Sequence, residues 1–190
     1  MKDNNYEAKL VIKAKSGDNY SLNLLADLYY NKIFKMAFYR TSSKSDAQDL
    51  TQDIFLQMVK SINSLKDNSQ FKSWLYKIAI NKIMDHYRKK KILSFFGTIN
   101  DISNNFEQID KTDIEQDIIK KEFLLSFKKY SNSLSKWEKE VFLMRFFDEL
   151  SIKEISQTLK KSESTVKTNL YRALKKFRQN KVFNEIANLN

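Results

Sequence analysis

Residues 151–178, with the sequence SIKEISQTLKKSESTVKTNLYRALKKFR, predict two amphipathic helices joined by a very short turn. Ser151 and Glu154 form a capping-box signature, in which a serine hydroxyl and a glutamate carboxylate accept hydrogen bonds from backbone N–H groups at a helix start. The first helix is therefore expected to begin after Ser151 and to end just before the turn at residues 160–162. A longer helix is expected over 163–178, so that the pair forms a helix-turn-helix.

The outward face of the second helix is a candidate binding surface. Ile155 and Val166 are spaced to pack the two helices together, which leaves polar side chains on the opposite side. These side chains are Lys167, Thr168, Tyr171, Arg172 and Lys175. Arginine and lysine bind guanine edges and phosphates, whereas an ordinary helical hairpin with a solvated basic face is the alternative. The local charge and the capping box favour DNA binding, although Lys160 replaces the glycine that many such turns contain.

The composition of the whole chain predicts an all-α protein. The 190 residues include only two glycines and no proline, so the frequent turns that a sheet needs are missing. Hydrophobic residues make up 42% of the chain, with 14 Phe and 9 Tyr, which is enough for real cores. The length suits either one large domain or two small ones.

Several classes of protein are unlikely on composition alone. Cysteine is absent, which excludes disulfides and thiolate metal sites. No apolar run approaches membrane-spanning length and the first residues do not resemble a signal peptide, so we expect a cytoplasmic protein without a membrane partner. His86 is the only histidine, and no nucleophile–base set can be built around it. The sequence also contains no recognisable phosphate-binding loop or metal-ligand cluster. We therefore expect no enzyme, no cofactor, no metal and no small-molecule substrate.

Charge is segregated along the chain, whose net charge is +11. Residues 72–91 contain seven basic residues and one acid, and residues 160–181 contain eight basic residues and one acid. Between them, residues 98–117 contain six acids and one lysine. An AT-rich genome would raise the lysine content but would not sort it in this way. Two basic blocks separated by an acidic connector indicate two contacts with a polyanion.

Helical periodicity divides the N-terminal half into three helices. Apolar residues recur at helical spacing over about 20–40, and Ser45 with Gln48 is a capping-box signature for a second helix that runs to about residue 62. Residues 65–70 are expected to form a polar loop. A third helix is expected over about 71–91.

Two polar stripes lie on these helices. On the second helix, Asp46, Asp49 and Asp53 lie opposite the apolar face, with Gln52 beside them. Such a stripe repels DNA and suggests a basic protein partner. The alternative is structural, since acids in the first turn of a helix interact favourably with the helix dipole. On the third helix, a spacing of 100° per residue brings an aromatic, an amide and two cations to one face. These residues are Trp74, Lys77, Asn81 and Arg88.

Two segments in this order resemble the extracytoplasmic-function (ECF) sigma factors of the sigma-70 family. Residues 46–91, which include DAQDLTQDIFL and FKSWLYKIAIN, look like the second conserved region of that family. Residues 134–178, which include LSIKEIS and STVKTNLYRA, look like the fourth. A narrower resemblance connects the chain with the clostridial sigma factors that control toxin and bacteriocin genes.

The resemblance implies a role for each polar set. The residues that would bind core RNA polymerase are Asp46, Asp49, Gln52 and Asp53. The residues that would bind the −10 promoter element, with a flipped base held by the loop, are Lys66, Asp67, Asn68, Ser69, Gln70, Trp74, Lys77, Asn81 and Arg88. The residues that would read the −35 element, with Lys175 on phosphate, are Lys167, Thr168, Asn169, Arg172 and Lys175. The partners implied are core polymerase and promoter DNA, and the resemblance leaves room for an anti-sigma factor.

The predicted layout has two helical domains and an acidic linker. Domain 1–91 would be region 2, 92–113 the linker, 114–180 region 4 and 181–190 a tail. Within region 4 we expect an opening helix over 114–130 and a second helix that begins at a capping box formed by Ser135 and Glu138. Two other classes of function stay open on the residues alone. A stand-alone helix-turn-helix regulator would bind specific duplex DNA tightly without polymerase. A basic RNA-binding or scaffolding protein would bind without regard to sequence and with a steep salt dependence.

Overall fold

The computed structural model describes residues 3–95 and 133–178, and side chains in the first range from Tyr6 to Lys90. The chain divides into two compact units, residues 1–108 and 109–190. Every regular element in the described ranges is a helix, as the composition predicted. The first unit contains α1 (Asp3–Lys15), α2 (Asn19–Thr41), α3 (Lys44–Ser61), the 3-10 turns η1 (Ile62–Ser64) and η2 (Asn68–Gln70), and α4 (Phe71–Phe95). The second contains α6 (Lys136–Phe146), α7 (Ile152–Leu159) and α8 (Glu163–Arg178).

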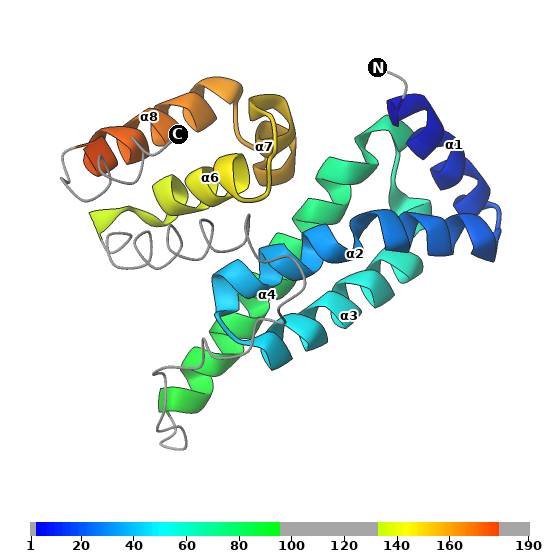
Figure 1. Cartoon of the computed structure of the whole chain (residues 1–190), viewed down its shortest axis with the longest axis horizontal. Coiled ribbons are helices and arrows are strands. Elements are labelled where there is room, and N and C mark those ends of the chain that lie inside the picture. Colours follow the sequence, from blue (N-terminus) through cyan, green and yellow to red (C-terminus); the bar gives the residue numbers. More distant parts are fainter. Residues whose placement is uncertain (1–2, 96–132, 179–190) are drawn as a thin grey trace, which may run out of the picture. The chain divides into compact units, whose positions relative to one another are not determined.

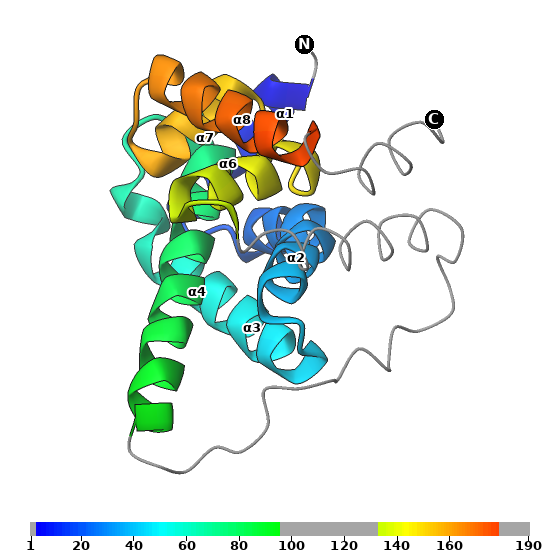
Figure 2. The same cartoon turned by 90° about the vertical axis from the view of Figure 1, so that its left-hand side faces the viewer.

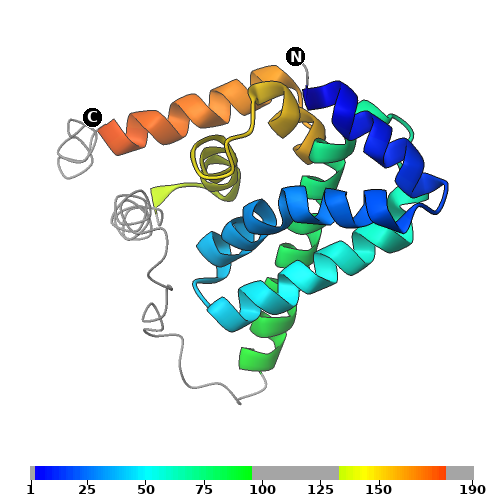
Figure 3. The same cartoon turned by 45° about the vertical axis from the view of Figure 1, so that its right-hand side comes forward.

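In the first unit, α2 and α3 run antiparallel and α4 crosses both (Figures 2 and 3). The core is built from residues at i, i+4 spacing, such as Leu25, Tyr29 and Ile33 of α2, all of which are buried. Phe71 at the start of α4 is fully buried, and its ring meets that of Tyr29 edge-on with centroids 5.6 Å apart. The helix predicted over 71–91 extends to Phe95.

Helix α1 was not predicted from the sequence. From Tyr6 onward, where its side chains are described, the buried ones are Leu10, Val11 and Ala14 on the last turns, so the apolar pattern is too short to stand out. Gly17 ends the helix with a φ of +92°, a backbone conformation that favours glycine. Asp18 then caps α2 by accepting from the backbone N–H groups of Tyr20 and Ser21, and α1 packs against α2 and both 3-10 turns.

The predicted start of α3 was wrong by two residues. Ser42 is in the left-handed region and Ser43 is extended, so Ser43 is the N-cap and its hydroxyl accepts from Asp46 N–H at 3.2 Å. The helix therefore begins at Lys44, which places Ser45 inside its first turn. Because the residue before the first helical one supplies the cap, the predicted Ser45–Gln48 capping box does not form.

The second unit confirms the helix-turn-helix and both predicted capping boxes (Figure 1). Ser151 N–H donates to Glu154 at 2.7 Å, and the same reciprocal pair joins Ser135 and Glu138 at the start of α6. Lys160 closes α7 in the left-handed conformation, with φ 52° and ψ 45°, so the turn forms with a lysine at the position where glycine is usual. The buried residues of this unit include Val141, Phe142, Met144, Ile155, Val166, Ala173 and Phe177.

Across these described ranges, no helix combines the length and the apolar character that crossing a bilayer requires. The predicted linker (92–113), the helix predicted over 114–130 and the tail (181–190) lie outside the described residues, apart from the last turn of α4.

Candidate nucleic-acid and protein interfaces

Helix α8 presents the polar face that the sequence predicted. Lys167, Thr168, Tyr171, Arg172 and Lys175 are all exposed, while Asn169 is half-buried. Lys167 lies 4.0 Å from Glu163 one turn earlier, a weak surface pair. Within the part of the chain that the structure describes, Arg172 and Lys175 make no hydrogen bond or ion pair. Both cations are therefore available to an external anion.

Thr168 and Asn169 are already hydrogen-bonded within α8. The Thr168 hydroxyl donates to Ser164 C=O at 2.9 Å, and Asn169 Nδ2 donates to Thr165 C=O at 2.8 Å. Each side chain therefore turns a donor back onto its own helix. Thr168 has thus used its only donor and keeps acceptor capacity, which suits a donor on the ligand such as an exocyclic amino group of a base. Asn169 keeps its Oδ1 acceptor and the second N–H of Nδ2, so it can pair with either kind of group.

A buried carboxylate fixes α8 against α6. Glu138, whose side chain is 6% exposed, accepts from Lys176 Nζ at 2.7 Å and from Ser135 N–H at 2.8 Å. Lys176 also donates to Ser133 C=O at 3.1 Å. Burial acts to raise the pKa of Glu138, but the hydrogen bonds from Lys176 and Ser135 and the lysine charge outweigh it and hold the pKa below its ordinary value. An ionised Glu138 therefore contributes to the packing of α8 against α6, beside the buried apolar residues Val166, Ala173 and Phe177.

On α3, the acidic stripe divides into two parts. Asp46 is only 27% exposed because it faces α4, where His86 Nε2 lies 3.5 Å and Lys90 Nζ 3.4 Å from its Oδ2. Sequence reasoning had placed Asp46 on the same outer stripe as Asp49 and Asp53. In the structure, Asp46 joins two helices, and His86 is partly buried in that contact.

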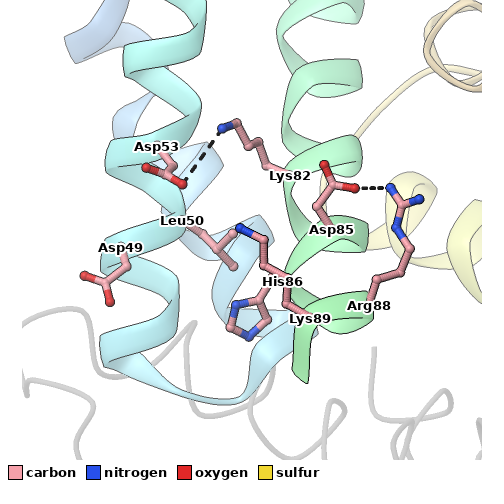
Figure 4. Close-up of a pocket in the computed structure, with 8 residues that line it drawn as sticks. All are labelled: Asp49, Leu50, Asp53, Lys82, Asp85, His86, Arg88 and Lys89. Atoms are coloured by element: carbon pink, nitrogen blue, oxygen red, sulfur yellow. Dashed lines mark hydrogen bonds and ion pairs between the residues drawn. The ribbon is translucent and has the colours of Figure 1, made fainter. Parts of the chain in front are cut away.

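Asp49, Gln52 and Asp53 form the exposed part of the stripe. Figure 4 shows the Asp49 carboxylate pointing away from α4, while the Asp53 carboxylate lies 3.9 Å from Lys82 Nζ. The Asp53 side chain is 61% exposed, so this contact leaves it open to a second cation. A pocket between α3 and α4 is lined by Asp49, Leu50, Asp53, Lys82, Asp85, His86, Arg88 and Lys89.

The segment 65–70, which was expected to be a polar loop, contains the 3-10 turn η2. Asp67 caps η2 by accepting from Ser69 N–H at 3.0 Å, from the Ser69 hydroxyl at 2.7 Å and from Gln70 Nε2 at 2.8 Å. The Ser69 hydroxyl and the Gln70 amide hold the pKa of Asp67 below its usual range. Lys66, Asp67, Ser69 and Gln70 remain exposed, so a preformed polar turn faces solvent.

The α4 stripe is only partly exposed. Trp74 is half-buried and its ring tilts against Phe71 with centroids 5.8 Å apart. Lys77 is half-buried, whereas Asn81 and Arg88 are exposed. Arg88 also pairs with Asp85 one turn earlier (Figure 4). The four side chains therefore lie along one helix, but they differ in how much of each a ligand could reach.

Comparison with known proteins identifies the family. Residues 25–92 match the family model described as Sigma-70 region 2, and residues 124–177 match Sigma-70, region 4. RNA polymerase sigma factor SigV of Bacillus subtilis is 30% identical over 146 residues, which cover 77% of this chain and 82% of that protein. The chain belongs to the sigma-70 family. ECF RNA polymerase sigma factor SigW of Bacillus subtilis is 27% identical over 176 residues, covering 90% of this chain and 94% of that protein, so this sigma factor is of the ECF type.

Two solved structures share the fold of this sigma factor. CnrH, in complex with the cytosolic domain of CnrY, has a TM-score of 0.67 at 19% identity and matches 90% of this chain and 93% of that one. RpoE of Bartonella quintana, in complex with the anti-sigma factor NepR, has a TM-score of 0.61 at 20% identity over 90% of this chain and 98% of that one. As an alternative sigma factor, the chain directs transcription initiation by RNA polymerase. The narrower clostridial resemblance stays a prediction.

The sequence analysis missed three features of the sigma factor's surfaces. Lys15 of α1 contacts the 65–70 turn, and Lys90 pairs with Asp46. In the second unit, Lys161 of the turn places its ammonium 5.2 Å from the ring centroid of Trp137 on α6. Each contact joins residues more than 20 positions apart, so no local sequence pattern predicts it. Among the residues that the structure describes, no group of three or more acidic or histidine side chains could hold a metal.

Proposed function

We propose that α8 reads the −35 promoter element in the major groove. The observation that carries this proposal is the pair of exposed, unpaired cations Arg172 and Lys175 on the second helix of a helix-turn-helix, inside the region 4 match. Arg172 would address a base edge and Lys175 a phosphate, with Lys167, Thr168 and Asn169 on the same surface.

The proposed −10 surface lies in the first unit. The turn 66–70 would hold one unpaired base, and Trp74, Lys77, Asn81 and Arg88 would contact the neighbouring strand. A partly exposed tryptophan suits stacking on a base, and amide and cationic groups suit base edges and phosphates. The pairing of Arg88 with Asp85 is at the surface, where a phosphate can replace the carboxylate at small cost.

The proposed polymerase-binding surface is the exposed face of α3. Asp49, Gln52 and Asp53 offer two carboxylates and an amide that would meet a basic helix of core polymerase. Asp46 belongs to the same proposed surface, but its carboxylate is shared with His86 and Lys90. We therefore expect Asp46 to contribute less to polymerase affinity than Asp49.

We also assign a mode of action and a location as part of this proposal. The sigma factor acts by binding and not by catalysis, in the cytoplasm where core polymerase and DNA are found. The domain bounds 1–91 and 114–180, with 92–113 as a linker, are part of the same proposal. An anti-sigma factor is a further proposed partner, since RpoE, which shares the fold, was solved with NepR.

The deciding experiment is transcription by core polymerase from a promoter library, with and without the purified sigma factor. Asp49→Lys should abolish binding to core enzyme, since reversing one charge of an interface pair costs about 2–5 kcal/mol. Asp27→Lys is the matched control, because Asp27 is an exposed acid on α2 outside the proposed surfaces. Normal co-purification of Asp49→Lys with core enzyme would remove this face of α3 from the interface.

The same assay separates the roles of the two α8 cations. Arg172→Ala should change the preferred base at one −35 position, with a loss of about 1–3 kcal/mol. Lys175→Ala should weaken all promoters alike and reduce the salt dependence. If the free protein instead binds specific duplex DNA tightly and polymerase adds nothing, it acts as a stand-alone regulator and the sigma assignment of these surfaces fails.

A further inference from the structure

Helix α1 contacts the proposed −10 turn through the side chain of Lys15, among other residues. Lys15 Nζ donates to the Asn68 side-chain oxygen at 2.5 Å and also to Leu65 C=O, in a partly buried contact that joins residues 53 and 50 positions apart. Helix α1 packs against both η1 and η2. Because α1 ends before residue 25, it lies outside the region 2 match. A segment beyond the family match therefore touches the turn that would hold a base.

The Lys15 ammonium determines which way the Asn68 amide points. An ammonium carries three donors and no acceptor, so only the amide oxygen of Asn68 can face it. An asparagine on an open loop could present either its oxygen or its NH2 group to a ligand. Here the oxygen is taken by Lys15, so the NH2 group is turned the other way. Nδ2 has no protein partner among the described residues, and Asn68 is half-exposed.

The rest of the turn restricts Asn68 further. Leu65 and Phe71 are buried at its two ends, so the exposed residues between them cannot shift freely. Asp67 is committed to the Ser69 and Gln70 donors, which makes it an internal cap of the turn. Asn68 is therefore the residue of this turn whose amide donor has a fixed direction and no partner within the described chain.

We propose that Lys15 is a specificity-positioning residue: it orients Asn68 so that Nδ2 donates to an acceptor atom on an unpaired base of the −10 strand. This inference rests on the −10 function proposed for residues 66–70. A base whose exposed edge presents a nitrogen or oxygen acceptor is favoured, and a base that presents only a donor at that edge is disfavoured, because two donors would face each other. Lys15 of α1 thus contributes, through Asn68, to the base preference at one promoter position.

The test uses the full chain with core polymerase and a promoter library randomised over the −10 element, with the transcripts sequenced. Asn68→Asp keeps an acceptor for Lys15 and removes the outward donor. We expect it to reduce the base preference at one position roughly tenfold, the size expected for losing one such hydrogen bond. Lys15→Met should reduce the preference at the same position, and the double variant should show no further loss there. Lys15→Arg should retain the preference.

Lys9→Met is the matched control, since Lys9 is an exposed lysine on the same helix that makes no hydrogen bond or ion pair with the described chain. We would measure the affinity for core polymerase and the thermal midpoint of every variant. These two values distinguish a loss of Asn68 positioning from a folding defect. If Lys15→Met lowers the midpoint, the base preferences are measured at a temperature at which every variant is fully folded.

The outcomes distinguish a failure of this inference from a failure of the −10 function on which it rests. If the Asn68 variants change a −10 preference while Lys15→Met, measured where it is folded, does not, Lys15 has no positioning role and the −10 surface stands. If Asn68→Asp, Asn68→Ala and Trp74→Ala all leave every −10 preference unchanged, the −10 surface itself is wrong. Loss of preference at different positions in the Lys15 and Asn68 variants also overturns the inference.

Discussion

Replacing Glu138 by glutamine should destabilise the second unit, because this buried carboxylate joins α6 to Lys176 of α8. Glu138→Gln keeps the shape of the side chain and an oxygen for Ser135 N–H, so the helix cap survives while the charge opposite Lys176 is lost. A hydrogen bond to a charged group contributes about 1.5–3 kcal/mol. The Lys176 side chain is 40% exposed, so the pair lies between the surface case and the fully buried case. We therefore expect a loss of about 2 kcal/mol, or about 10 °C in thermal midpoint for a domain of this size.

The two tryptophans make this measurable in the full chain. Trp137 lies in the second unit next to Glu138, and Trp74 lies in the first, so a Trp74→Phe background leaves Trp137 as the reporter for urea unfolding. Glu163→Gln is the matched control, because Glu163 pairs with Lys167 only at the surface and 4.0 Å away. The reasoning fails if Glu138→Gln and Glu163→Gln unfold at the same urea concentration.

The same pair predicts a pH dependence with a definite sign. The pKa of Glu138 in the folded protein lies below its ordinary value of 4.5. Its contribution to stability is therefore complete above pH 4.5 and is lost as the pH falls through the lower folded pKa. The difference in unfolding free energy between the parent and Glu138→Gln should stay constant from pH 7 to about pH 5 and shrink below 4.5. A difference that grows as the pH falls would contradict the assigned direction.

Three further outcomes are expected. Lys160→Gly should stabilise the second unit by about 0.5–1 kcal/mol in urea unfolding, because Lys160 is in the left-handed conformation with φ 52°; no change would mean that the turn tolerates a side chain without strain. Asp46→Asn should lower the stability of the first unit by about 1 kcal/mol, because Lys90 loses its ion-pair partner and His86 loses the carboxylate beside it, whereas Asp49→Asn should leave stability unchanged and weaken polymerase binding. Replacing the linker acids Glu107, Asp110 and Asp113 by Asn or Gln should impair promoter-dependent RNA synthesis while both units stay folded; if synthesis is normal and free-DNA binding merely tightens, the acids only suppress stray binding.

Local chemistry explains what the sequence could predict. The bounds of α8 and the capping boxes at Ser135 and Ser151 were predicted correctly, because each depends on residues within a few positions of one another. The start of α3 was misjudged because three serines compete for the cap, and only the backbone decides that Ser43 is extended. The exposed face of α8 followed from helical spacing, which is also local.

What could not be predicted depends on contacts between distant residues. Asp46 faces α4 because of the way α3 and α4 cross. The helical periodicity of either segment does not predict how the two helices cross. The Lys15–Asn68 contact depends on where α1 lies, and α1 itself has too short an apolar pattern to be recognised. The cap of η2 is a different case, because Asp67 accepts from Ser69 and Gln70, only two and three positions away. This local signal was overlooked, since residues 65–70 were expected to be a polar loop and Asp67 was assigned to −10 binding by resemblance.

The ion pairs between α3 and α4 limit how this protein can be re-engineered or can diverge. Asp46 with His86 and Lys90, and Asp53 with Lys82, connect the helix assigned to polymerase with the helix assigned to promoter DNA. A chimaera that transplants α3 from a relative to retarget the polymerase would leave unmatched cations on α4. Substitutions on the two helices should therefore accumulate in compensating pairs, and orthogonal variants should be built by exchanging α3 and α4 together.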